Sequence, residues 1–198
     1  MTKFDKLAKF SFDLFFSIAG LIITFPFIVT AWIFASIETK SNGFFTQIRI
    51  GKNGKLFKIV KIKTMKRVEG FSSTVTTSND KRITFTGAFF RKTKIDELPQ
   101  LFNVLLGHMS FVGPRPDVPG YADKLSNADM IILSVRPGIT GPAQLLYNNE
   151  EDLLANQDNP IRYNDEVIWP HKVKINRKYV EHYSFVADIH YIWKTIIG

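Results

Sequence analysis

A short segment near the middle of the chain places basic side chains directly before two adjacent carboxylates. Residues 91–100 read Arg-Lys-Thr-Lys-Ile-Asp-Glu-Leu-Pro-Gln, so three basic residues precede Asp96 and Glu97. A carboxylate can attack a phosphorus atom as a nucleophile, and a second carboxylate can hold Mg²⁺, a hard cation that prefers oxygen ligands. Adjacent residues on a helix point about 100° apart, so the two carboxylates would serve different purposes. The segment therefore predicts chemistry on phosphate groups.

The same two carboxylates also have a purely structural explanation. Asp is a good N-cap residue, and Glu in the first turn of a helix interacts favourably with the helix dipole. A second candidate, Arg115, lies between Pro114 and Pro116. Its low conformational freedom favours bidentate phosphate binding, but a surface salt bridge is an equally good explanation. The residues alone leave these alternatives open.

The elements that must position these side chains can be predicted from apolar spacing. Phe44–Ile50 and Leu56–Ile62 flank a segment that contains Asn53-Gly54, which predicts a β-hairpin. From Ile95 to Met109 the apolar residues recur at helical spacing, with Pro99 in the first turn and Gly107 at the end. Four further segments are expected as follows: a Ser/Thr-rich loop over 68–80, a helix over 117–135, a rigid turn over 136–142 and an amphipathic interfacial helix within 175–197.

An uncharged apolar stretch runs from Leu14 to Ile37 and is long enough to cross a membrane as a helix. It is too long for a signal peptide, and no small-residue cleavage site follows it. Pro26 favours a kink near its middle, and both flanks are basic, which favours the same, cytoplasmic side for both ends. We therefore expect a re-entrant helix-break-helix rather than a straight span, with Thr24 a candidate partner for the backbone groups freed at the break.

The composition limits the other possible functions. The chain has 198 residues, a formal net charge of +8 and no cysteine, which excludes disulfides, Cys-based zinc sites and a thiol nucleophile. The positive charge indicates a polyanionic partner, and residues 40–67 carry much of it. An anionic membrane explains this basic segment more simply than nucleic acid does, because the segment has no recognised base-reading element.

Several motifs, in order along the chain, resemble those of the monotopic phosphoglycosyl transferases, a bacterial sugar transferase family. The motifs are Asp13 before the apolar segment, Phe-Thr-Gln-Ile-Arg-Ile-Gly (45–51), Lys-Ile-Val-Lys-Ile-Lys-Thr-Met (58–65), Ile-Asp-Glu-Leu-Pro-Gln-Leu-Phe-Asn-Val-Leu (95–105), Met-Ser-Phe-Val-Gly-Pro-Arg-Pro (109–116), Arg-Pro-Gly-Ile-Thr-Gly (136–141), and Ser184-Phe185 with Asp188. Each is moderate evidence, whereas the complete ordered set is specific.

The resemblance implies a mostly helical α+β membrane protein. Residues 1–40 would form the re-entrant helical hairpin. Residues 41–198 would form a small cytoplasmic catalytic domain with interfacial amphipathic helices and a short β-hairpin. The expected location is the cytoplasmic face of the bacterial inner (cell) membrane.

The resemblance also implies a two-step reaction. Asp96 would attack the β-phosphate of a UDP-sugar and release UMP, and the phosphosugar would then pass to polyprenyl (undecaprenyl) phosphate. Glu97, the second catalytic residue, would bind the Mg²⁺ cofactor. The expected substrate-binding residues are Arg91, Arg115, Lys63 and Arg136. Besides the two substrates, the expected partner is an anionic phospholipid membrane, and no nucleic acid is expected.

The chain departs from the family pattern in a few places. Phe25-Pro26 replaces the frequent Ser-Pro at the membrane break, and Lys63 stands where many members have Arg. Asn148 stands where many members have an Arg, and an acidic stretch runs from 150 to 166. The alternative function is a non-catalytic membrane-anchored scaffold of the same fold, against which the intact Asp96-Glu97 pair and Arg115 argue.

Overall fold

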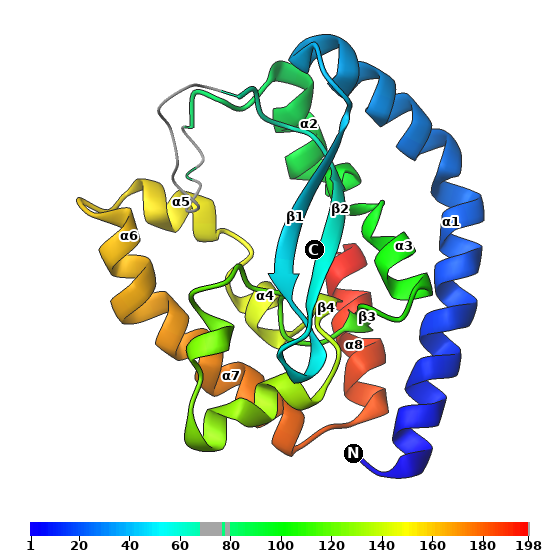
Figure 1. Cartoon of the computed structure of the whole chain (residues 1–198), viewed down its shortest axis with the longest axis vertical. Coiled ribbons are helices and arrows are strands. Elements are labelled where there is room, and N and C mark those ends of the chain that lie inside the picture. The colour runs from blue at the N-terminus through cyan, green and yellow to red at the C-terminus, as the bar shows by residue number, and fades with distance from the viewer. Residues whose placement is uncertain (68–76, 78–79, 198) are drawn as a thin grey trace.

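The computed structural model describes residues 1–67, 77 and 80–197. A long N-terminal helix lies along one side of the molecule, and the rest of the chain packs beside it (Figure 1). The expected loop over 68–80 lies outside the described residues, apart from residues 77 and 80.

Helix α1 spans Lys3–Thr39 as one continuous helix. Thr2 and Asp5 form a capping box at its start, and Lys40 in the left-handed conformation (φ 48°) ends it. The expected break at Pro26 is absent: Pro26 lies inside the continuous helix, and the C-terminal part of α1 leans toward α2 (Phe85–Thr93) (Figure 1). The Thr24 hydroxyl donates to the Gly20 carbonyl over 2.7 Å, so Thr24 is not the partner of the Ile22 carbonyl that Pro26 leaves without its helical donor.

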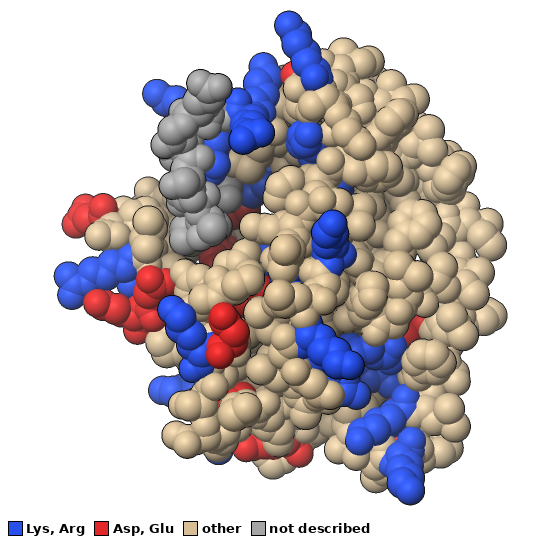
Figure 2. All heavy atoms as spheres, viewed as in Figure 1, with Lys and Arg blue, Asp and Glu red and all other residues tan. Residues whose placement is uncertain are grey.

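Most of the α1 surface is apolar and exposed. Phe15, Ile22, Phe25 and Phe34 are each about half exposed or more, and by length and composition α1 could cross a membrane, a criterion that a core helix can also meet. The side of the molecule that α1 covers is almost free of charged side chains in Figure 2, with Lys and Arg near both of its ends. This distribution suits a helix that faces lipid.

The predicted hairpin is confirmed. Strands β1 (Phe44–Ile50) and β2 (Leu56–Ile62) pair antiparallel, with Phe44 opposite Ile62 and Ile50 opposite Leu56. Asn53 (φ 55°) and Gly54 (φ 73°) take the left-handed conformation in the turn, as the Asn-Gly pattern predicts. The second sheet consists of two short parallel strands, β3 (Ser110–Val112) and β4 (Gly138–Thr140).

The predicted helix over Ile95–Met109 is shorter than expected and begins differently. A 3₁₀ turn covers Ile95–Glu97, and α3 covers Gln100–Leu105, with Pro99 as its N-cap and Gly107 (φ 74°) just beyond its end. The Asn103 side chain accepts from the Val60 amide (3.0 Å) and donates to the Lys58 carbonyl (2.7 Å). This pair of bonds fastens α3 to the edge of β2.

The predicted helix over 117–135 is wrong. This segment forms irregular loop with 3₁₀ turns at Ala122–Lys124 and Asn127–Ser134. Gly120 (φ 107°) and Asn127 (φ 51°) adopt positive φ, which interrupts a right-handed helix at two points. The apolar residues of the segment therefore reach the core from a loop.

The C-terminal third is helical. Its elements are α4 (Pro142–Leu146), α5 (Glu150–Ala155), α6 (Pro160–Tyr163), a π-helical turn (Asn164–Ile168), α7 (Trp169–Glu181) and α8 (Phe185–Ile197). The predicted interfacial helix within 175–197 is two helices, α7 and α8. On α8, Val186, Trp193 and Ile196 are more than 60% exposed, so this helix has an apolar surface that no described residue covers.

The buried residues form three clusters that join distant segments. In the first, Ile28, Ala31 and Ala35 of α1 pack against Ile62 and Phe90. The other two clusters join β2 to α3 (Phe57, Ile59, Val104, Met109) and β3 to α7 (Val112, Tyr179, Val180). Helix α1 thus contributes directly to the core of the body that carries the Asp96-Glu97 pair.

Candidate active site

Asp96 is buried in the 3₁₀ turn between α2 and α3. Lys94 ends α2 in the left-handed conformation (φ 58°) and turns the chain so that the next residues point inward. The Asp96 residue is 6% exposed, and its Oδ1 atom is buried with no hydrogen-bond partner among the residues that the structure describes. The structural explanation of Asp96 as an N-cap is wrong, because no side-chain cap bond forms at this turn and Pro99 caps α3.

The environment of Asp96 makes it a weaker acid than usual. Burial raises the pKa of its carboxyl to about 6, against the opposing charge of Lys61, and the nearby Glu97 carboxylate raises it further. A buried carboxylate with an unpartnered oxygen retains most of its nucleophilicity, because no donor holds its lone pairs. This group is ionised at neutral pH and available for attack.

Glu97, the next residue, is held in an ion-paired network. Its Oε1 atom accepts from Lys61 Nζ at 2.7 Å and lies 3.5 Å from an Arg115 guanidinium nitrogen. Burial alone would raise the pKa of Glu97, but the charges of Lys61 and Arg115 outweigh it and the pKa falls well below its usual value. Glu97 therefore stays charged over the physiological pH range, in contrast to its neighbour.

Lys61 is the residue of this network that sequence reasoning placed elsewhere, within the basic segment assigned to the membrane. It lies near the end of β2, and burial lowers the pKa of its ammonium despite the Glu97 carboxylate beside it. The available signal was the strand period: Lys58 and Lys61 point to opposite faces of β2, and Lys58 is exposed. Only the inward residue reaches the site.

Arg91 belongs to the same region. Its guanidinium pairs with the Glu151 carboxylate and donates to the Thr64 hydroxyl over 3.4 Å, and its charge acts on Asp96. Glu151 comes from the acidic stretch 150–166, whose role the sequence left open. At least one acidic residue of that stretch therefore contacts a residue of the predicted site.

The loop that carries Arg115 is stiff and tightly packed. Gly113 lies so close to β4 that a Cβ atom on Gly138 would come within 2.1 Å of the Gly113 amide nitrogen. On its other side, Arg49 donates to the Pro116 carbonyl (3.0 Å) and the Ile50 amide donates to the Asp117 carbonyl (2.9 Å). The Arg115 side chain is 43% exposed, so its guanidinium contacts Glu97 and is also accessible to a ligand.

Asp117 is a partly buried carboxyl that sequence reasoning did not assign. Burial raises its pKa to about 7, opposed by the charges of Lys172, Arg49 and Arg115. The neighbouring Lys172 ammonium pairs with Glu150 at 2.5 Å. A layer of alternating charge therefore extends from Glu97 through Arg115 to α7.

The structure separates Lys63 and Arg136 from this cluster. Lys63 donates to the Ser41 hydroxyl (2.8 Å) just beyond the end of α1. Arg136 pairs with Asp13 of α1 at 3.0 Å and lies over the Phe10 ring. Neither has a contact with Asp96 or Glu97 among the bonds of the described residues, whereas Arg91 and Arg115 both adjoin the pair.

Asp13 is the centre of a buried polar group that fastens α1 to the body. It is 1% exposed and accepts from the Ser110 hydroxyl and the Phe111 amide, both at 3.0 Å, as well as from Arg136. A second buried ion pair joins Lys9 to Asp188 of α8. These contacts fix the register of α1 against β3 and α8.

Asp96 and Glu97 carry the carboxylates that could bind the expected Mg²⁺. The described residues contain no group of three or more His, Cys, Asp or Glu side chains placed to hold a metal ion. Mg²⁺ usually takes one or two protein carboxylates and completes its shell with water and substrate phosphates. The unpartnered Oδ1 of Asp96 and the adjacent Glu97 carboxylate suit that mode, so the donors fit a site completed by a substrate.

The chain is similar in sequence to several bacterial proteins of polysaccharide and sugar-phosphate metabolism. The chain is 45% identical over 116 residues (58% of this chain, 65% of the relative) to a Bacillus subtilis protein with the provisional name undecaprenyl-phosphate N-acetylgalactosaminyl 1-phosphate transferase. It is 34% identical to the exopolysaccharide production protein PSS of Rhizobium leguminosarum, over 98% of this chain and 96% of that one. It is 31% identical to the UDP-glucose:undecaprenyl-phosphate glucose-1-phosphate transferase of Escherichia coli, over 97% of this chain but 40% of the relative.

The sequence pattern of the bacterial sugar transferases matches residues 4–198, which include α1, both carboxylates of the site and the Arg115 loop. The chain belongs to the bacterial sugar transferase family.

Proposed function

We propose that this protein transfers a sugar 1-phosphate from a UDP-sugar to undecaprenyl phosphate through a covalent intermediate on Asp96. The observation that carries the proposal is the buried Asp96 carboxylate with an unpartnered oxygen, beside a Glu97 that Lys61 and Arg115 keep charged. The names of the relatives support the reaction class, since they describe transfer of sugar 1-phosphates to undecaprenyl phosphate.

In the first step the Asp96 carboxylate attacks the β-phosphorus of the donor. A bond forms between Asp96 and phosphorus, the bond from that phosphorus to the bridging oxygen breaks, and UMP leaves with the electron pair. Arg115 and Arg91 would bind the charged phosphate oxygens and hold the diphosphate in line for attack, with Arg91 exchanging its Glu151 partner for the phosphate. Mg²⁺, when bound at Glu97, supplies further charge neutralisation on the diphosphate and the departing UMP.

In the second step a phosphate oxygen of the lipid attacks the same phosphorus. The acyl phosphate bond to Asp96 breaks, the carboxylate is regenerated, and the product is an undecaprenyl-diphosphate sugar. Direct transfer would need one polyanion to attack another. The two-step route replaces that reaction with two displacements at phosphorus, in which Asp96 is first the nucleophile and then the leaving group.

The proposal includes residence at the cytoplasmic face of the bacterial cell membrane. The lipid acceptor demands access to the bilayer, and the exposed apolar residues of α1 and α8 suit contact with lipid. Phe85, at the start of α2, is 90% exposed and is a further apolar side chain available to lipid. The basic residues that follow α1 would bind anionic headgroups.

Intact-protein mass spectrometry tests the proposal. The detergent-solubilised protein is incubated with Mg²⁺ and a panel of UDP-sugars in the absence of lipid acceptor. We expect a mass increase equal to one phosphosugar, which is absent in Asp96→Asn and disappears when undecaprenyl phosphate is added. If no donor gives an adduct and no UMP is released after the lipid is added, the transferase function is wrong and the scaffold alternative takes its place.

A further inference from the structure

The Arg91 guanidinium, one of the groups expected to bind the donor, already has a carboxylate partner. Its Nη2 atom pairs with Oε1 of Glu151 on α5, and its Nη1 atom donates to the Thr64 hydroxyl over 3.4 Å. The charge of Arg91 also acts on the Asp96 carboxyl. Glu151 therefore neutralises a cation whose field reaches the proposed nucleophile.

A carboxylate and a phosphate compete for the same face of a guanidinium. Both present oxygens at a spacing that fits two parallel N–H donors of Arg. Among the bonds of the described residues, Arg91 donates to Glu151 through one nitrogen and one oxygen only. A phosphate that bonds to both terminal nitrogens of Arg91 would therefore make a better partner than Glu151 does.

Glu151 can leave Arg91 more easily than Arg91 can remain unpaired. The Glu151 side chain is 44% exposed, so water would solvate the carboxylate once it is released. The Arg91 side chain is only 21% exposed, so its charge would be poorly solvated without a partner. The pair is thus suited to persist in the empty site and to exchange when an anion arrives.

The rest of α5 has other attachments that this exchange leaves intact. Glu150 pairs with Lys172 of α7 at 2.5 Å, and both side chains are less exposed than that of Glu151. Leu154, on the next turn of α5, is 2% exposed. Rotation of the Glu151 side chain alone would therefore free Arg91, with no need for α5 to unfold or detach.

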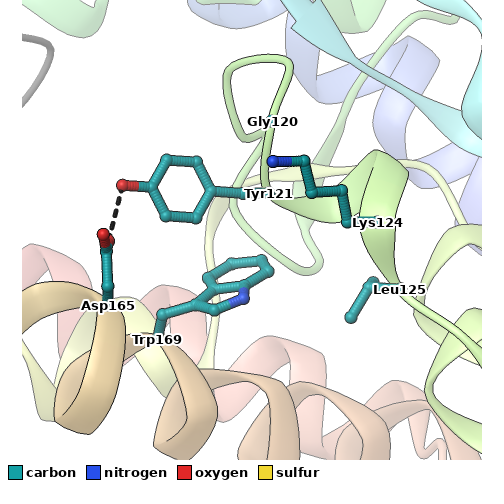
Figure 3. Close-up of a pocket in the computed structure, with 6 residues that line it drawn as sticks. All are labelled: Gly120, Tyr121, Lys124, Leu125, Asp165 and Trp169. Carbon is teal, nitrogen blue, oxygen red and sulfur yellow. Dashed lines mark hydrogen bonds between the residues drawn. The ribbon is translucent and has the colours of Figure 1, made fainter.

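The acidic stretch 150–166 is also fastened at its far end. Asp165 accepts from the Tyr121 hydroxyl over 2.8 Å, and the Trp169 ring meets the Tyr121 ring edge to face, at the edge of a cavity (Figure 3). Within the described part of the chain, Glu151 is the acidic residue of this stretch that bonds to a predicted substrate-binding residue. The other contacts of the stretch hold it against the loop and α7.

We propose that Glu151 is an intramolecular competitor of the donor, paired with Arg91 in the empty site and displaced by the β-phosphate of a bound UDP-sugar. The inference rests on the proposed function, since it assumes that Asp96 attacks that phosphate. After transfer, the same carboxylate returns to Arg91 and displaces the diphosphate of the lipid product. Glu151 thereby weakens the binding of donor and product alike.

Binding measurements on the full-length protein test this assignment. Asp96→Asn protein, which lacks the nucleophile, is titrated calorimetrically in detergent and Mg²⁺ with UMP and with a panel of UDP-hexoses and UDP-N-acetylhexosamines. The donor that binds most tightly is then measured on the same protein with Glu151→Gln added. Asp152→Asn is the matched control, because it removes the same charge from the next residue of α5, whose side chain is exposed.

We expect Glu151→Gln to bind the UDP-sugar about fivefold more tightly, because the donor no longer has to displace a carboxylate. Binding of UMP, which has no β-phosphate, should change less than about twofold, and Asp152→Asn should leave both affinities unchanged. Weaker binding of the UDP-sugar in Glu151→Gln would mean that Glu151 positions Arg91 for the donor and would overturn the proposal. Unchanged binding would overturn it as well.

A second comparison shows whether the effect acts through Arg91. In an Arg91→Met background, titrated at higher donor concentrations, Glu151→Gln should give no gain in affinity, because the cation for which the two anions compete is gone. A fivefold gain that persists there would reflect general charge repulsion and would also refute the competition. If no UDP-sugar binds even the Asp96→Asn parent, the proposed function itself fails.

Discussion

The Lys61 ammonium lies 2.7 Å from the Glu97 carboxylate, and this contact joins the β-hairpin to the turn that carries Asp96. Both side chains are about 15% exposed, so water solvates neither charge well, and each charge is stabilised mainly by the other. Arg115 contacts the same oxygen atom from the opposite loop at 3.5 Å. Three segments that are distant in sequence therefore meet at one carboxylate next to the proposed nucleophile.

Removing Lys61 is expected to damage both stability and activity. In Lys61→Met, Glu97 loses its closest partner, its pKa rises, and the protein loses about 3 kcal/mol of stability. Thermal unfolding and the rate of UMP release measure the two effects. Lys58→Met is the control, since Lys58 lies on the same strand with its side chain exposed. Equal behaviour of the two variants would show that the Lys61–Glu97 pair has no special importance.

The first half-reaction should depend on the ionisation of Asp96. Only the carboxylate attacks phosphorus, and its pKa is about 6, so the rate of adduct formation should rise with pH and reach half its maximum near pH 6. Asp117, with a pKa of about 7, is a second carboxyl near the site that titrates in this range. Rapid-quench measurements of adduct formation from pH 5 to 8.5 on wild type and Asp117→Asn decide which carboxyl controls the rate. If the rise of the rate with pH disappears in Asp117→Asn, it belongs to Asp117.

Asp96→Asn should be inactive yet more stable than wild type at neutral pH. The folded-state pKa of Asp96 is raised from 3.8 to about 6, so the folded protein binds this proton more tightly than the unfolded chain does. The ionised group therefore costs stability that increases as pH rises from 4 to 6, to at most about 3 kcal/mol. Unfolding experiments at pH 7.5 and pH 4 check this, with the exposed Asp158→Asn as control. A stability gain that persists undiminished at pH 4 would contradict the explanation.

Mg²⁺ removal should stop the reaction before the covalent step. With EDTA present, we expect neither adduct nor UMP, and full recovery when excess Mg²⁺ is restored. Glu97→Gln should need a higher Mg²⁺ concentration for half-maximal rate, because a neutral amide is a weaker ligand for a hard cation. Adduct formation at an unchanged rate in EDTA would exclude Mg²⁺ from the first step.

Asp13 is expected to matter for stability far more than its position on an apolar helix suggests. Asp13→Ala removes the acceptor for Ser110, Phe111 and Arg136 and leaves a partly buried guanidinium unpaired, which should cost about 3 kcal/mol. Glu181→Gln, which breaks an exposed i,i+4 pair with Arg177, serves as the control and should cost less than about 0.5 kcal/mol. Comparable melting temperatures for the two variants would refute this role.

Local signals in the sequence predicted part of this structure correctly. The Asn53-Gly54 pair predicted the hairpin, because Asn and Gly adopt positive φ readily and this preference does not depend on the rest of the chain. The Asp96-Glu97 pair was likewise visible as a local cluster. Contacts between Lys61 and Glu97, or Arg91 and Glu151, were not predictable in this way, since they depend on how whole segments pack.

The wrong helix over 117–135 has a similar cause. Its residues are apolar at intervals that a helix could use, but Gly120 and Asn127 turn the chain to the left and tertiary contacts outweigh propensity. The contact between the Tyr121 and Trp169 rings was not predicted, for the same reason. Tyr121 and Trp169 are distant in sequence and meet only because the loop folds over the start of α7.

The buried ion pair between Lys9 and Asp188 also governs the order in which the protein can be completed. The two residues are 179 positions apart, and Asp188 accepts a further bond from the Tyr179 hydroxyl (2.8 Å). During synthesis α1 is made before α8, so Lys9 lacks its ion-pair partner Asp188 until α8 has been made. Helix α1 can therefore take its final position only after α8 has been made, and this contact between residues so far apart in sequence should form late in folding.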